Sequence, residues 1–155
     1  MTAAIFYHPE AYTTSGPKLM GRNAAGESFL RGFFLHSRAE KFAVQVMERA
    51  QGQSFADVAQ SLNRNEPVSV VDKSNLGSLR AHGVVYHPGP GIADHARQRS
   101  FWGNGAWSLC GITHTTSSTR AMDSINQLVT APVQPWDALI CTSSAVRKNV
   151  EFLLE

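Results

Sequence analysis

A histidine followed by a run of hydroxyl side chains is the stretch of this sequence best suited to chemistry. The apolar residues 109–112 lead into Thr113 and His114, and positions 115–119 are all Ser or Thr. An imidazole at the end of a strand can donate or accept a hydrogen bond, and neighbouring hydroxyls suit a polyhydroxylated ligand. The alternative is that residues 115–119 cap the next helix and that His114 is a structural histidine. Spacing alone leaves both interpretations open.

A second candidate lies between residues 87 and 105. It begins His87-Pro-Gly-Pro-Gly91, in which the prolines stiffen the backbone, and continues to Asp94 and His95. Imidazole and carboxylate groups bind zinc, but no cysteine or third histidine falls at a ligand-like spacing, so we expect no metal site. We expect the polar side chains that follow to begin a helix or to bind a polar acceptor: Asp94, His95, Arg97 and Arg99.

Short apolar runs alternate with stretches of helical spacing, which is typical of an α/β domain. The predicted strands are 3–7, 41–47, 67–71, 82–86, 107–113 and 138–142. The predicted helices are 24–35, 54–62, 119–129 and 144–154, with Ser54 as the N-cap of the second. This order predicts a Rossmann-like open parallel sheet with helices on both faces. Loops at the carboxyl ends of its strands, here 8–23 and 87–105, would line a ligand crevice.

The first of these loops carries Lys18 and Arg22, which can hold an anionic or sugar acceptor or can be ordinary solvated charges.

The composition of the chain limits its domain organisation and its partners. The 155 residues, 43% of them hydrophobic, fit one domain, and a formal charge of +2 without a basic run disfavours nucleic acid. No apolar run approaches the roughly 18 residues of a membrane span, and no leader precedes the first strand, so we expect a cytoplasmic protein with Cys110 and Cys141 as free thiols.

Several enzyme classes are disfavoured because their motifs are missing. There is no Gly-x-Ser-x-Gly elbow, no Gly-x-Gly-x-x-Gly after the first strand and no phosphate-binding Walker loop. Serine hydrolases, dinucleotide enzymes and P-loop nucleotidases therefore do not fit.

Two segments carry a family resemblance. Gly111-Ile-Thr-His-Thr115, followed by a helix and then Trp136-Asp-Ala-Leu-Ile-Cys-Thr-Ser143, resembles the N-terminal domain of retaining glycosyltransferases with the two-domain GT-B architecture, of the glycogen/starch synthase-like and mannosyltransferase-like family 4. Asp137 and Ser143 occupy the family's Asp and Ser positions. Ala25-Gly26 resembles the family's glycine loop, in which two adjacent glycines are usual.

The resemblance implies a role for each matching position. His114 contacts the donor sugar at the reaction centre, and Thr115, Ala25 and Gly26 lie at the donor. The acceptor side is assigned to four residues: Lys18, Arg22, His87 and His95. The partners are a nucleotide-sugar donor, a sugar or lipid-linked acceptor, and a C-terminal domain that supplies most donor contacts; no cofactor is expected.

This chain would then be the acceptor-side half of a hexosyltransferase and a fragment of a longer protein, with little or no turnover by itself. A competing hypothesis from another class is a stand-alone α/β binding or interaction module without catalysis.

Overall fold

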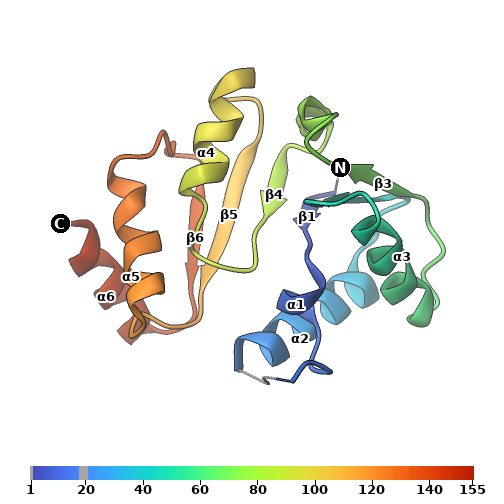
Figure 1. The fold of residues 1–155 in the computed structure, drawn as a ribbon, viewed down its shortest axis with the longest axis horizontal. Coiled ribbons are helices and arrows are strands. Elements are labelled where there is room, and N and C mark those ends of the chain that lie inside the picture. Colours follow the sequence, from blue (N-terminus) through green and yellow to red (C-terminus); the bar gives the residue numbers. More distant parts are fainter. Residues whose placement is uncertain (1, 18–20) are drawn as a thin grey trace. The chain divides into compact units, whose positions relative to one another are not determined.

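The computed structural model describes residues 2–17 and 21–155 and is an α/β protein (Figure 1). Contacts divide the chain into two compact units, Met1–His82 and Gly83–Glu155. Each unit holds three parallel strands flanked by helices. The predicted Rossmann-like α/β class is therefore confirmed, and all six predicted strands exist; the single-domain organisation stays a prediction.

The first unit begins with a strand and ends with a 3-10 helix. Its elements are β1 (Ala4–Phe6), α1 (Pro9–Tyr12), α2 (Gly21–His36), β2 (Phe42–Gln45), α3 (Gln51–Ser61), β3 (Val68–Val71) and η1 (Leu76–Ala81). The strand order is β3-β2-β1, with Ile5 opposite Val44 and Val44 opposite Val70. All four residues of β2 are buried, because β2 is the middle strand.

Aromatic rings fill the core of this unit. Phe34, Phe42 and Phe55 are fully buried, and the ring of Phe34 lies 5.0 Å from that of Phe42 and 4.9 Å from that of Phe55. Burying each such side chain contributes about 1.5 to 3 kcal/mol. These contacts join α2, β2 and α3, so they fix the helices against the strands.

Helix α1 lies against α2 (Figure 1), and a glycine permits the contact. A Cβ atom at Gly26 would collide with the backbone carbonyl of Ala11. The predicted loop over residues 8–23 is therefore partly wrong, because α1 and the beginning of α2 lie within it. Ala25 and Gly26 lie inside a helix and not in a glycine loop.

The predicted N-cap of the second helix is also wrong. Helix α3 begins at Gln51, so Ser54 lies within it. The hydroxyl of Ser54 instead forms a 2.8 Å hydrogen bond with the hydroxyl of Tyr7, the residue after β1. The hydroxyl of Ser54 therefore makes a tertiary contact and does not cap the helix.

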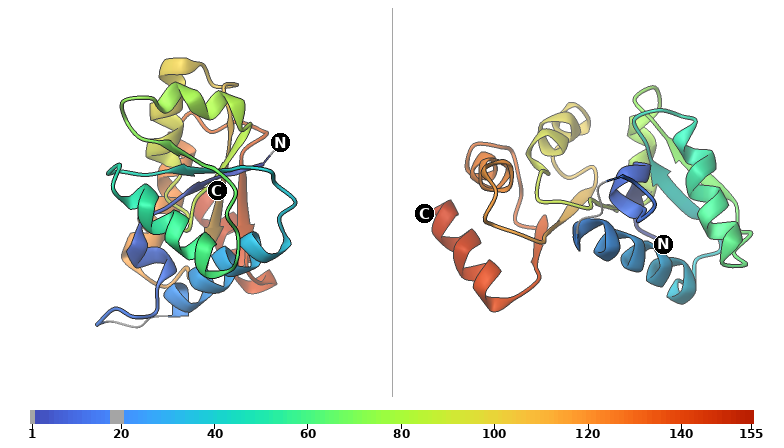
Figure 2. Two further views of the ribbon diagram at one scale, coloured as in Figure 1. Left: turned by 90° about the vertical axis from the view of Figure 1, so that its right-hand side faces the viewer. Right: turned by 60° about the horizontal axis from the view of Figure 1, so that its bottom comes forward.

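The second unit alternates strands and helices throughout. Its elements are β4 (Val84–Tyr86), α4 (Ala93–Arg99), η2 (Ser100–Trp102), β5 (Ser108–Thr113), α5 (Thr119–Asn126), η3 (Gln127–Val129), β6 (Ala138–Cys141) and α6 (Ser144–Leu154). The strand order is β4-β5-β6, all parallel. Helices α4 and α5 lie on the same side of these strands (Figure 2). Ser118 and Ser143 cap α5 and α6.

A buried ion pair anchors the amino end of β6. The side chains of Arg99 and Asp137 are 0% and 3% exposed, and two guanidinium nitrogens donate to the carboxylate at 2.6 and 2.8 Å. The carboxylate also accepts from the backbone N–H groups of Leu109 and Gln134, both at 2.8 Å. Asp137 thus ties α4, β5 and the start of β6 together.

Two further sequence predictions concern cysteines and membranes. Cys110 and Cys141 are free thiols, as expected, and both are half-buried. Across residues 2–17 and 21–155, no helix has the length and apolarity that a membrane crossing needs.

Candidate functional site at the carboxyl edge of the second unit

The three strands of the second unit end at one edge, and a polar residue follows each strand. His87 follows β4, His114 follows β5 and Thr142 follows β6. The backbone N–H of His87 donates to the carbonyl of Cys110 at 2.8 Å, and the hydroxyl of Thr142 donates to the carbonyl of Thr113 at 3.0 Å. These bonds hold the three strand ends together, so the backbone at this edge holds the side chains in fixed positions.

The loop after β4 crosses directly over β5. The backbone N–H of Ile112 donates to the carbonyl of Gly89 at 3.2 Å. A Cβ atom at Gly111 would lie only 2.8 Å from that same carbonyl oxygen. Glycine at position 111 therefore lets the loop approach the strand, which explains in physical terms why a glycine precedes Ile112 in the motif.

Most of the hydroxyl run has partners within the unit. Ser118 accepts from an N–H in the first turn of α5 at 3.2 Å, as the capping alternative required. The hydroxyls of Thr115 and Ser117 are 2.9 Å apart, and the amide of Asn149 donates to the hydroxyl of Thr116 at 2.9 Å. The run therefore shapes the loop between β5 and α5, and Thr115 and Ser117 keep exposed surface beside His114.

His114 has a different environment from these hydroxyls. Its side chain is half-buried, and burial lowers the pKa of the imidazole, which keeps it neutral at neutral pH. Among the described residues none forms a hydrogen bond with the ring, and neither ring nitrogen is fully enclosed. The neutral ring of His114 therefore has one donor and one acceptor nitrogen that no described residue occupies, at the end of β5.

The buried ring of His87 packs against the half-buried ring of His95 in the same unit. His87 is 3% exposed, and its ring centroid lies 4.1 Å from that of His95 on α4. Burial lowers the pKa of His87 well below its usual value, with a further contribution from His95. Burial also lowers the pKa of His95 to about 4, although the charge of Asp94 opposes the shift. Both rings are neutral at neutral pH, and their burial supports a packing role under the loop.

The other charges near this loop are engaged with one another. Asp94 pairs with Arg97 at 2.7 Å on the surface of α4. Within residues 2–17 and 21–155, no three metal-ligating side chains lie together. Arg99, which the sequence suggested for a helix start or a polar acceptor, instead lies fully buried against Asp137 at the opposite end of the strands. Sequence spacing contains no signal for that pair, because 38 residues separate its members.

The remaining predicted site residues belong to the first unit. Arg22 lies exposed near the start of α2, and Ala25 and Gly26 lie further along the same helix. Lys18 falls outside the described residues. Gly26 is buried against α1, and the assignment of Ala25 and Gly26 to the donor stays a prediction.

The carboxyl edge of the first unit holds a polar cluster that the sequence did not indicate. Asp72, which follows β3, accepts hydrogen bonds from the hydroxyl and N–H of Ser74 at 2.5 and 2.8 Å, and from Arg49 at 3.0 Å. The Ser74 hydrogen bonds, followed by the Arg49 contact, lower the pKa of Asp72 to about 2. Because the carboxylate is satisfied locally, the cluster closes a turn and offers no free group for chemistry.

Comparisons of the chain with models of protein families, with curated proteins and with solved structures gave no match.

Proposed function

We propose that this chain is the acceptor-side domain of a retaining glycosyltransferase, with His114 contacting the donor sugar. The observation that carries the proposal is His114 itself, a neutral imidazole at a rigid strand end whose ring nitrogens have no protein partner among the described residues. A neutral imidazole can form hydrogen bonds with a sugar hydroxyl without first losing a proton. The resemblance of residues 111–115 and 136–143 to family 4 glycosyltransferases supports the same assignment.

The proposed reaction transfers a sugar with retention of configuration. It breaks the bond between the anomeric carbon and the nucleotide diphosphate, and it forms a bond from that carbon to an acceptor hydroxyl oxygen. The hydroxyl proton leaves with the diphosphate. Thr115, whose hydroxyl is exposed beside His114, would add a second contact to the donor. As the resemblance implies, a C-terminal domain would supply the contacts to the diphosphate.

The test begins with the coding sequence beyond Glu155. If the reading frame continues into a second α/β domain, the whole protein is expressed and assayed with a panel of nucleotide sugars, and released nucleotide is measured. We expect wild-type turnover and a loss of at least about a hundredfold in kcat for His114→Ala, because one positioned group typically contributes 10²- to 10⁴-fold.

A matched control separates chemistry from folding. Gln60→Ala removes an exposed polar side chain from α3, in the other unit, and should leave kcat unchanged. Equal activity of His114→Ala and wild type would refute the proposal. Nucleotide-sugar binding that His114→Ala weakens, with no turnover from the whole protein, would instead support the binding-module hypothesis.

A further inference from the structure

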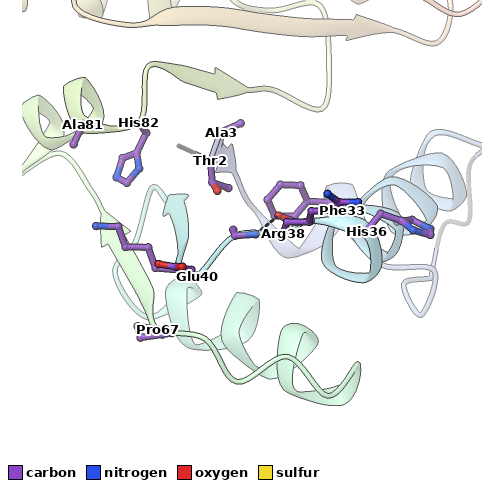
Figure 3. Close-up of a pocket in the computed structure, with 13 residues that line it drawn as sticks. Thr2, Ala3, Phe33, His36, Arg38, Glu40, Pro67, Ala81 and His82 are labelled. Atoms are coloured by element: carbon purple, nitrogen blue, oxygen red, sulfur yellow. Dashed lines mark hydrogen bonds between the residues drawn. The ribbon is translucent and has the colours of Figure 1, made fainter.

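A cavity lies at the amino edge of the first unit, where β1, β2 and β3 begin. The cavity has a volume of about 1170 Å³ and is lined only by residues of Met1–His82 (Figure 3). Thr2 and Ala3 precede β1, Lys41 precedes β2 and Pro67 precedes β3. The amino ends and the carboxyl ends of parallel strands lie at opposite edges of the sheet. This amino-edge cavity is therefore separate from any site at the carboxyl edge of the unit.

His82 is the unusual side chain of this cavity. It is only 9% exposed, yet it lines the cavity, and Figure 3 shows its ring directed toward the open space beside Thr2. In the described part of the chain no group forms a hydrogen bond with the ring, and its nitrogens are not fully enclosed. A polar ring that is nine-tenths buried normally has a hydrogen-bond partner, and the open nitrogens of His82 leave room for one from outside the chain.

The charges around His82 indicate which kind of partner. Four basic side chains line the cavity against one carboxylate, that of Glu40: the basic residues are His36, Arg38, Lys41 and His82. Within residues 2–17 and 21–155, neither Arg38 nor Lys41 forms an ion pair, although five other basic residues do. Lys41 and His82 line the same cavity, and burial, followed by the charge of Lys41, lowers the pKa of His82.

The end of α2 does not neutralise these charges. Helix C-termini carry a partial negative charge that attracts basic side chains. Here Arg64 occupies the carbonyls at that end: its guanidinium donates to Phe34, to Ser37 at 3.0 Å and to Ala39 at 3.5 Å. Arg38 and Lys41 therefore keep their positive charges available for an external anion.

We propose that the amino-edge cavity binds a phosphorylated small molecule, with its phosphate at His82 and Lys41. Phosphate offers several acceptor oxygens to the two donors at once, and hydrogen bonds between charged groups are the stronger kind. The apolar residues that also line the cavity, Phe33, Pro67 and Ala3, suit the organic part of the molecule. The proposed site uses none of the residues assigned to glycosyl transfer, so the two proposals stand or fall separately.

The test is a titration of the chain with inorganic phosphate and with phenyl phosphate, followed by NMR of the histidine rings. We expect both ligands to raise the pKa of His82, because an anion stabilises the imidazolium, and phenyl phosphate to bind several-fold more tightly. Lys41→Gln should weaken phosphate binding about tenfold through the loss of one charge-assisted hydrogen bond. In the absence of ligand it should also raise the pKa of His82, because the nearby positive charge is gone.

Lys73→Gln is the matched control. Lys73 is an exposed lysine of the same unit, beyond the carboxyl end of β3, so its loss changes the net charge equally and should leave phosphate affinity unchanged. An unchanged pKa of His82 at saturating phosphate, or equal weakening by Lys73→Gln and Lys41→Gln, would overturn the site. Equal affinity for the two ligands would overturn the assignment of the apolar lining residues to the organic part of the molecule.

Discussion

Replacing Asp137 by Asn tests whether the buried ion pair holds the second unit together. In the native chain the carboxylate accepts two hydrogen bonds from Arg99 and one each from the N–H groups of Leu109 and Gln134. Asparagine keeps one oxygen and turns an NH₂ group toward the remaining donors, and it leaves a fully buried guanidinium uncompensated. Breaking one partner of a buried pair costs about 3 to 5 kcal/mol. That is a large share of the roughly 5 to 15 kcal/mol that stabilises a domain.

The assay is urea unfolding followed by tryptophan fluorescence, since all three tryptophans, Trp102, Trp107 and Trp136, lie in the second unit. With a urea dependence of roughly 1.5 kcal/mol per M, a loss of about 3 kcal/mol lowers the midpoint by about 2 M. Asp94→Asn is the control, because Asp94 is 85% exposed in its pair with Arg97 and should cost at most about 1 kcal/mol. Equal midpoints for the two variants would refute the reasoning.

Two further predictions concern packing and pH. Gly26→Ala should destabilise the first unit by about 3 kcal/mol, because a Cβ atom at this position meets the backbone of α1. Gly32→Ala on the same helix has free space around the new Cβ atom and should be neutral or stabilising by up to about 1 kcal/mol. Thermal unfolding followed by far-ultraviolet circular dichroism measures the stability of both variants. The pKa of His95 is about 4 in the folded chain and 6.5 in the unfolded chain, so the unfolded state binds more protons between these values, and the stability of the second unit should fall as the pH drops from 6.5 to 4. His95→Gln should flatten that dependence in urea midpoints measured across the range, and an unchanged slope would contradict the burial of the histidine pair.

The candidate site was only partly predictable from sequence. His114 could be placed at a strand end because the apolar run 109–112 ends beside it and the following hydroxyls begin a helix. The helix over residues 24–35 could be predicted from its apolar side chains, but the contact of Gly26 with α1 could not, because no local pattern encodes the packing of two helices. The burial of His87 was equally hidden, since a histidine after a strand has the same sequence pattern whether its ring is open to solvent or covered by α4.

Local chemistry determined the order of the elements. Strands such as β3 and β5 and helices such as α5 and α6 follow from apolar spacing and from serine caps, which act over a few residues. Tertiary structure decided which polar groups are paired and which stay open. Arg99 meets Asp137 across 38 residues, Arg64 reaches the end of α2 from a later segment, and His82 is left lining a cavity without a protein partner in the described part of the chain. Such pairings depend on distances between segments that only the folded chain brings together, so no local pattern encodes them.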